Sequence, residues 1–371
     1  MKKLLFVLCI ALSFGAISAE MKAYHTPGVP NTVTLDNGLL KLSFVPELNG
    51  SLCAWEYQPT GHSIIRPMKY HVEKVDLLPD RVSASKDGFR CRVWESNRKI
   101  TDSMRVKKLT ATPAEGCTLV LHSPLTGGTE LDLTSELRLL PGSTLLNGKI
   151  TLINRQNAAG RYSLWFNAVF AMCDKPEPVL VPVRSKVDRI GKLGMVFAEE
   201  DGILSELHDG NRNMYFAALR PWIAKKAVDR PGVAVLEITD SQVDKMIFYT
   251  HKSALLHTME ILAPSMPMAK GVRCVQEFRI FYFPSLTSLR EICGNFGVDI
   301  KDGCLEIESA VPVGKSIWSI SGKDYPVPAL QPGKLHKIKL QTAPGKNLKI
   351  SVNGKEFTLP GMLTSDLKKA Y

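Results

Sequence analysis

Residues 161–172 read Arg-Tyr-Ser-Leu-Trp-Phe-Asn-Ala-Val-Phe-Ala-Met. Every second residue from Tyr162 to Met172 is apolar, and alternate residues of a β-strand share one face of the sheet. Similar alternation recurs through most of the chain, whereas helical periodicity of useful length is nearly absent. These patterns predict an all-β protein that consists mainly of long antiparallel strands.

Strand candidates with this alternation follow one another from Thr32 to Tyr282. They cover residues 33–35, 39–45, 69–75, 89–95, 118–123, 131–140, 144–154, 162–172, 233–238, 245–250, 255–262 and 272–282. Asn37-Gly38, between the first two candidates, supplies the positive φ angles of a tight hairpin turn. One large antiparallel β domain is therefore expected over residues 20–284.

The pattern changes after residue 284. Residues 285–293 are typical of a short helix, because Ser288 and Glu291 have the spacing of a capping box. We expect a linker helix over residues 285–297 and a small β-sandwich module over residues 298–371. The strand candidates of this module are residues 304–307, 316–320, 336–340, 348–352 and 356–359, with a hairpin turn at Asn353-Gly354.

The first 19 residues have the pattern of a secretory signal peptide. Lys2-Lys3 precede an apolar run over residues 4–17, and Ser18-Ala19 are small residues suited to cleavage. The run is too short for a permanent membrane-spanning helix, and no later stretch is long and uncharged enough to form one. We therefore expect an exported protein, periplasmic or secreted, with no transmembrane segment after signal removal.

The chain is basic, with a formal net charge of +11, and removal of Lys2 and Lys3 with the signal would leave +9. Such an excess suits an anionic partner, for example a uronate or sulfated glycan, an anionic envelope surface or nucleic acid. The positive charges are scattered along the chain, which is also typical of a solvated surface. Because export separates the protein from nucleic acid, a nucleic-acid partner is not expected.

Seven cysteines follow the signal, and their odd number leaves at least one outside any intramolecular disulfide. No Cys-x-x-Cys pair and no His/Cys spacing indicates zinc, so we expect at most one disulfide and no metal site. The sequence also lacks a Gly-x-Ser-x-Gly elbow, a Walker loop, a His-Glu-x-x-His motif and a dinucleotide fingerprint. No cofactor is expected. The absence of these motifs argues against an ordinary hydrolase, kinase, zincin or dehydrogenase.

Two strand candidates carry aromatic and polar residues on the face that is not apolar. Trp165 and Asn167 share such a face, where an indole can stack on a pyranose and an amide can bond a hydroxyl. Trp165 could equally lie under a second sheet. Arg92 and Trp94 share a face of the strand candidate at 89–95 and could meet an anionic sugar, because arginine binds carboxylates bidentately. The alternative there is a solvent face on which arginine stacks on tryptophan.

Glu260 is the carboxylate that the sequence singles out, because it lies within the largely apolar stretch 255–264. A carboxylate in such a strand must form a pair with another group, be exposed at a cleft or have a raised pKa. A raised pKa is typical of a catalytic base. The alternative is a buried structural glutamate bonded to arginine or backbone. His71 shares a face with Glu73 and is either an acid–base residue or half of a surface ion pair.

Three stretches resemble, in order and spacing, the galactose-mutarotase-like proteins. Residues 37–52, NGLLKLSFVPELNGSL, are similar to the opening hairpin of that family. Trp165-Phe166-Asn167 resembles its middle strand, and residues 260–264, EILAP, resemble its late strand with a glutamate. The resemblance covers roughly residues 30–285, and it implies a β-supersandwich of long antiparallel sheets with a sugar site in a concave cleft.

The resemblance also implies roles for residues. Mutarotases use a glutamate base, a position that Glu260 would take, and a histidine acid in a sequence like His-Thr-Tyr-Phe-Asn. The corresponding stretch of this chain begins with Ser163, which cannot protonate a ring oxygen at neutral pH. A substitute acid would have to come from a neighbouring strand, and His71 is the candidate. The resemblance therefore implies sugar binding more directly than simple aldose mutarotation.

Three functions remain open from the sequence. The first is an exported carbohydrate-binding or carbohydrate-modifying protein, in which Trp165, Asn167, Arg92 and Trp94 hold a saccharide or polysaccharide. The second is an epimerase-like or lyase-like enzyme with Glu260 as base and His71 as acid. The third is a non-catalytic scaffold or interaction protein of the cell envelope. The sequence does not determine the sugar or the oligomeric state.

Overall fold

The computed structural model of the chain describes residues 20–28, 30–65, 70–73, 81–84, 88–95, 98–100, 103–125, 130–185, 196–197, 200–206, 214–239, 247–253, 256–341, 347–363 and 368–369. The signal peptide expected over residues 1–19 lies outside these residues. Within them the protein is built of β-strands in several sheets, as the sequence predicted, and the one short helix is a 3₁₀ turn, η1 (Pro46–Leu48).

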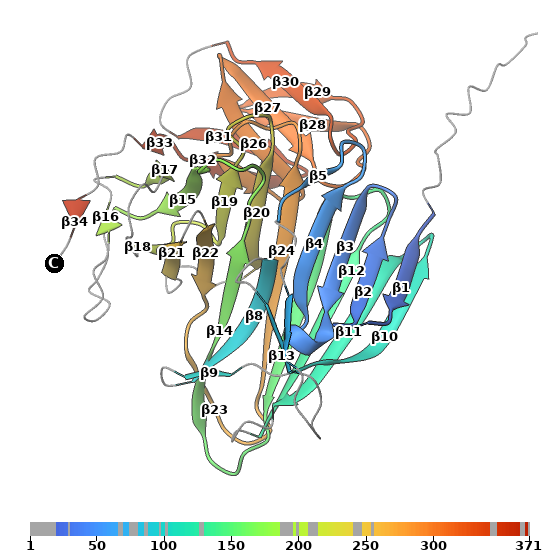
Figure 1. Cartoon of the computed structure of the whole chain (residues 1–371). Coiled ribbons are helices and arrows are strands. Elements are labelled where there is room, and N and C mark those ends of the chain that lie inside the picture. Colours follow the sequence, from blue (N-terminus) through green and yellow to red (C-terminus); the bar gives the residue numbers. More distant parts are fainter. Residues whose placement is uncertain are drawn as a thin grey trace, which may run out of the picture.

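The first large sheet runs in the order β1-β2-β3-β4-β8-β14-β22-β21-β18, and all its neighbours are antiparallel (Figure 1). Its strands are β1 (Lys22–Thr26), β2 (Thr32–Asp36), β3 (Leu40–Val45), β4 (Ser51–Tyr57), β8 (Gly88–Glu95), β14 (Gly160–Val169), β22 (Leu256–Leu262), β21 (Ile247–Ser253) and β18 (Met214–Ala217). Three short strands pair beside this path: β5 (His62–Ser63), β9 (Arg98–Ile100) and β23 (Met266–Met268).

The second large sheet runs in the order β10-β11-β12-β13-β24-β20-β19-β15-β17-β33. Its strands are β10 (Arg105–Thr112), β11 (Gly116–Leu125), β12 (Leu131–Leu139), β13 (Leu145–Asn154), β24 (Arg273–Phe283), β20 (Val233–Thr239), β19 (Trp222–Lys226), β15 (Val179–Val183), β17 (Gly202–Glu206) and β33 (Met362–Leu363). Only the last pair, between β17 and β33, is parallel in this sheet. The end of the chain thus returns to the large sandwich after the small one.

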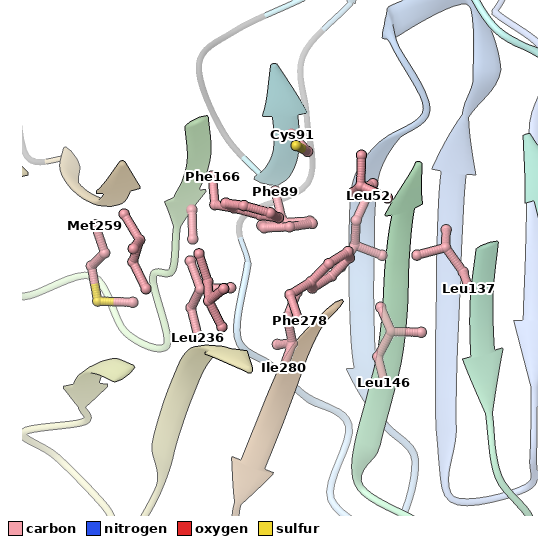
Figure 2. Close-up of a cluster of buried hydrophobic side chains, with 14 of the residues drawn as sticks. Leu52, Phe89, Cys91, Leu137, Leu146, Phe166, Leu236, Met259, Phe278 and Ile280 are labelled. Carbon is pink, nitrogen blue, oxygen red and sulfur yellow. The ribbon is translucent and has the colours of Figure 1, made fainter. Parts of the chain in front are cut away.

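The two large sheets pack face to face over one apolar core. Phe89 and Phe166 of the first sheet meet Phe278 of the second, with ring centroids 5.0 and 5.5 Å apart (Figure 2). Gly148 faces the same ring, and a Cβ atom at this glycine would lie only 2.0 Å from Phe278 Cζ. A side chain there would collide with the core, so the sandwich requires glycine at this point.

The small sandwich consists of two four-stranded sheets and is the orange-to-red part of Figure 1. One sheet has the order β25 (Glu291–Cys293), β26 (Phe296–Lys301), β27 (Cys304–Ser309) and β30 (Leu335–Lys339). The other has the order β29 (Lys323–Val327), β28 (Ser316–Ile320), β31 (Leu348–Val352) and β32 (Lys355–Leu359). They enclose a separate core around the buried Trp318. The expected domain boundaries themselves stay a prediction.

The helix expected over residues 285–297 is wrong, because these residues form a loop followed by the β25–β26 hairpin. Glu291 does not cap a helix, since its carboxylate accepts hydrogen bonds from Arg220 Nε at 2.6 Å and Trp222 Nε1 at 3.1 Å. The backbone amides of Ser285 and Leu286 donate instead to the side chain of Glu308. Residues distant in the sequence therefore form hydrogen bonds with the carboxylate and the amides that would have capped a helix.

Two two-stranded sheets complete the described structure. One pairs β16 (Val196–Phe197) with β34 (Lys368–Lys369), and the other pairs β6 (Tyr70–Glu73) with β7 (Arg81–Ala84). The seven cysteines from Cys53 to Cys304 form no disulfide within the described residues. In the same part of the chain, no helix is long and apolar enough to cross a bilayer.

Candidate functional site

The register of three neighbouring strands brings several of the predicted site residues together. Asn167 of β14 pairs with Arg90 of β8 on one side and with Glu260 of β22 on the other. Trp165, two residues earlier on β14, pairs with Arg92 of β8. Directly opposite residues of antiparallel strands have Cβ atoms about 5 Å apart, so these positions form one continuous patch.

This patch lies on the face of the first sheet that turns away from the core, which we call the outer face. Leu164 and Phe166 belong to the core between the sheets, so Trp165 and Asn167 between and beside them occupy the opposite face. Met259 and Ile261 flank Glu260 in the same way. The possibility that Trp165 lies under the second sheet is therefore excluded, because that sheet covers the other face.

The link between Asn167 and Glu260 is a direct hydrogen bond. Asn167 Nδ2 donates to Glu260 Oε1 at 2.7 Å, and the two residues are only 7% and 3% exposed. Of the states expected for Glu260, the structure shows a paired one, with a side-chain amide from the neighbouring strand as a partner. The bond holds the carboxylate at a defined place beside the indole of Trp165, which is itself 6% exposed.

The same row extends over two further strands that the sequence did not associate with the site. Glu260 pairs with Tyr249 of β21, and Tyr249 pairs with Tyr215 of β18. The row across the outer face thus reads arginine, asparagine, glutamate, tyrosine and tyrosine. Alternation had predicted a strand at Tyr249, but no local signal tells which strand lies next to it.

The register between β8 and β14 places Arg92 and Trp94 at the patch. Arg92 lies opposite Trp165, and Trp94 lies opposite Ser163 on the same pair of strands. The two residues therefore share the outer face with Trp165, as the strand pattern predicted. Their backbone positions fit the predicted role in binding.

His71 lies in a different place in the fold. It belongs to β6, where it pairs with Ser83 of β7, and this hairpin is not part of either large sheet. The role of His71 as a catalytic acid stays a prediction.

A second row of charged residues lies on the outer face of the second sheet. Arg279 of β24 belongs to this row, and its Nε donates to the buried Glu237 at 2.5 Å. Burial raises the pKa of Glu237 to about 6 despite the attraction of this guanidinium. Arg279 Nη1 also donates to Gly294 O, which ties the small sandwich to this sheet.

No metal centre is visible in the part of the chain that the structure describes, where no three His, Cys, Asp or Glu side chains come together. The arrangement on the first sheet instead combines an indole, an amide and a carboxylate on one face. Such a set can stack on the apolar side of a sugar ring and exchange hydrogen bonds with hydroxyl groups.

No protein-family model matches the sequence, and no curated protein matches it either. Similar solved structures include a galactose mutarotase-like protein from Clostridium acetobutylicum, at 8% identity and a TM-score of 0.49, covering 71% of this chain and 98% of that one. Another is a galactose mutarotase-like protein from Lactobacillus casei, at 13% identity and a TM-score of 0.44, covering 68% and 99%. A putative aldose 1-epimerase from Escherichia coli, at 12% identity and a TM-score of 0.42, covers 71% and 99%. Proteins of the family that the sequence resembles are thus found among the similar structures.

Proposed function

We propose that this protein binds a saccharide on the outer face of its first sheet, across strands β8, β14 and β22. The observation that carries the proposal is the buried hydrogen bond between Asn167 and Glu260 beside Trp165. These side chains come from strands about 90 residues apart and belong to no apolar core cluster. An oriented amide, carboxylate and indole on one face form a set that recognises a sugar.

Each residue has a distinct task in this proposal. Trp165 presents its ring to the C–H face of a pyranose, while Glu260 accepts hydrogen bonds from one or two sugar hydroxyls. Asn167 keeps Glu260 in place and offers its remaining amide valences. Arg92, whose position lies opposite Trp165, would attract a carboxylate or sulfate on the sugar.

A catalytic form of this function uses Glu260 as a base on a bound hydroxyl. The bond from Asn167 orients the carboxylate for that task, and His71 would have to supply the acid. Turnover would then show a bell-shaped pH dependence, because both groups must be in the correct protonation state. Binding alone requires no such acid.

The proposal includes export, with removal of residues 1–19. Lys2-Lys3 and the apolar run over residues 4–17 support it. The test is expression of the full chain in a bacterial host, followed by fractionation and determination of the N-terminus of the product. A periplasmic or secreted protein beginning at Glu20 is expected, and an uncleaved cytoplasmic chain would contradict export.

The binding test uses residues 20–371 on a glycan array with neutral, uronate and sulfated glycans side by side. Trp165→Ala is expected to weaken binding of the recognised class by about 10- to 100-fold, because stacking of an aromatic ring is lost. Trp165→Phe keeps a ring and is the matched control, with a smaller loss. Near-UV circular dichroism and thermal melting verify the fold of both variants.

Glu260→Gln separates binding from catalysis. The amide keeps the size of the side chain and can still bond Asn167 after rotation, but it cannot take up a proton. Reduced turnover with retained binding would establish catalysis by Glu260, whereas equal turnover would exclude it. Full binding by Trp165→Ala would contradict the proposed site, and silence of the whole array would favour the envelope-scaffold alternative.

A further inference from the structure

A groove at one end of the small sandwich has no part in the site proposed above. It consists of two adjoining hollows of about 430 and 810 Å³, which share Lys315, Ser316 and Asn353. Pockets of several hundred Å³ are of the size that binds small ligands or a segment of a polymer. The labels β28, β31 and β32 in Figure 1 mark the strands around it.

Turn geometry leaves this end of the sandwich open. The hairpin turn between β31 and β32 has positive φ angles at both Asn353 and Gly354, 51° and 74°, as the Asn-Gly pair predicted. A Cβ atom at Gly314 or Gly354 would meet no atom within 4 Å, so the chain beside the groove is not packed against anything. The course of the backbone at these turns therefore leaves the groove open.

The lining of the groove is basic and contains no acidic residue. Lys315 and Lys355 are both exposed, and neither forms an ion pair with a described residue. Lys337 of the same sandwich differs, since its ammonium group lies 2.7 Å from Glu306 Oε1. Two uncompensated lysines in one hollow create a positive potential that attracts anionic groups.

The groove also contains a buried hydroxyl group that lacks a partner. Ser316 shares a strand face with the core residue Trp318, and its Oγ atom is buried without a hydrogen bond to any described group. Buried polar groups nearly always have partners, and a water molecule or a ligand in the adjoining hollow would supply one to this hydroxyl. The ring of Phe357, partly buried on β32, lines the same hollow.

We propose that this groove binds an acidic polysaccharide. Lys315 and Lys355 hold carboxylate or sulfate groups, Ser316 bonds a hydroxyl, and Phe357 packs against a sugar ring. The second hollow is lined by the exposed Ile317, which offers an apolar surface to the next unit. An acidic peptide is the competing occupant, and polyglutamate represents it in the test below.

The test measures binding of residues 20–371 to polygalacturonate and to chondroitin sulfate, with a neutral galactan as comparison, at low salt. The double variant K315A/K355A is expected to bind the preferred anionic polymer about tenfold more weakly, because two ion pairs are lost. The control K334A/K339A removes two exposed lysines that do not line the groove, and it should change affinity by less than about twofold. Binding by the wild type should weaken as salt rises.

Ser316→Ala adds a readout that does not depend on charge. It should weaken binding severalfold while the melting temperature stays equal or rises, because an unsatisfied buried hydroxyl is removed. The comparison of K315A/K355A with K334A/K339A is repeated in a Trp165→Ala background, where binding at the first sheet is removed, so that the remaining difference reports on the groove alone. The inference is overturned if neither anionic polymer binds, if both double variants weaken binding equally, or if polyglutamate binds as tightly as the polysaccharides.

Discussion

The two large sheets share one core, but their outer faces differ. The first sheet presents Trp165, Asn167 and Glu260 on its outer face, joined by a hydrogen bond across strands. The second sheet carries an apolar cluster there, with Trp222 and Phe281 among its members. This cluster is covered by the segment that leads into the small sandwich.

The difference follows from what each face meets. A large apolar patch on a soluble sheet needs a cover, and Leu286, Leu289 and Ile292 of the connecting segment provide it. The buried Glu291 in this connecting segment accepts hydrogen bonds from Arg220 and Trp222, so its carboxylate has a structural role. On the first sheet, Trp165, Asn167 and Glu260 belong to no apolar cluster, although they are only 3–7% exposed. Three substitutions test this contrast in order of decreasing effect on stability, and a pH profile then tests the junction.

Phe278→Ala removes the ring on which both sheets depend. The loss of unfolding free energy is expected to be about 4 kcal/mol, because the ring is fully buried between Phe89 and Phe166. Val275→Ala is the control on the same strand, since Val275 is 44% exposed and should change stability by less than about 0.5 kcal/mol. Urea denaturation measures both, and equal effects would show that the core is not shared as described.

Glu291→Ala breaks the cover of the second sheet alone. It is expected to cost about 2–3 kcal/mol, because Arg220 and Trp222 lose their acceptor in a buried junction. Limited proteolysis should cleave more rapidly between residues 284 and 291, while saccharide binding at Trp165 persists. Simultaneous loss of that binding would mean that the two outer faces are coupled.

Asn167→Ala perturbs the other face. It leaves a buried Glu260 oxygen without its amide partner, so a loss of about 1–2 kcal/mol in stability is expected. Saccharide affinity should fall by more than tenfold, a larger effect on binding than the junction variant produces. Calorimetry on the same protein samples compares the two quantities. Unchanged affinity would argue that the Asn167–Glu260 pair is purely structural.

Glu308→Gln tests the junction through pH. Burial raises the pKa of Glu308 from 4.5 to about 8, although the amides of Ser285, Leu286 and Gly333 bond its carboxylate. Between pH 4.5 and 8 the folded state therefore holds the proton more tightly than the unfolded state. The stabilisation from this group is full below pH 4.5 and is lost as pH rises to about 8.

The measurable slope is about 1 kcal/mol per pH unit within that window. Wild-type unfolding free energy should fall relative to Glu308→Gln as pH rises from about 5 to 8, because the glutamine does not titrate. Parallel pH profiles of the two proteins would show that Glu308 does not titrate in this range. Denaturant titrations in a set of buffers at constant ionic strength provide the comparison.

Local pattern explains which strands could be predicted. Strands with one buried and one polar face, such as β12 and β24, alternate along the sequence and were located within one or two residues. The strands β15 and β19 are almost wholly buried, so they show no alternation and were missed. The edge strand β10 was missed for the opposite reason, because most of its residues are exposed.

Turns followed the same rule. Asn37 and Gly38 lie between β2 and β3 as predicted, but only Gly38 has a positive φ angle, 76°, and the amides of Leu39 and Leu40 donate to Asn37 Oδ1. The helix predicted over residues 285–297 does not form. Ser288 and Glu291 have the spacing of a capping box, but the Glu291 carboxylate accepts hydrogen bonds from Arg220 and Trp222 instead. At Asn37 the distant contacts support the turn, since its side-chain amide donates to Leu140 O and Ser143 O, whereas at Glu291 they replace the predicted helix.

The sequence by itself determined the all-β class and that Trp165 and Asn167 share a face, since strand geometry makes alternate residues share a side, but the structure decided that this face turns away from the second sheet. Only the tertiary structure decided that β8, β14 and β22 are neighbours and that Asn167 meets Glu260. The physical reason is that strand order is set by hydrogen bonds and core packing between segments far apart in the chain. No residue near Asn167 in the sequence carries information about which strand will lie beside it.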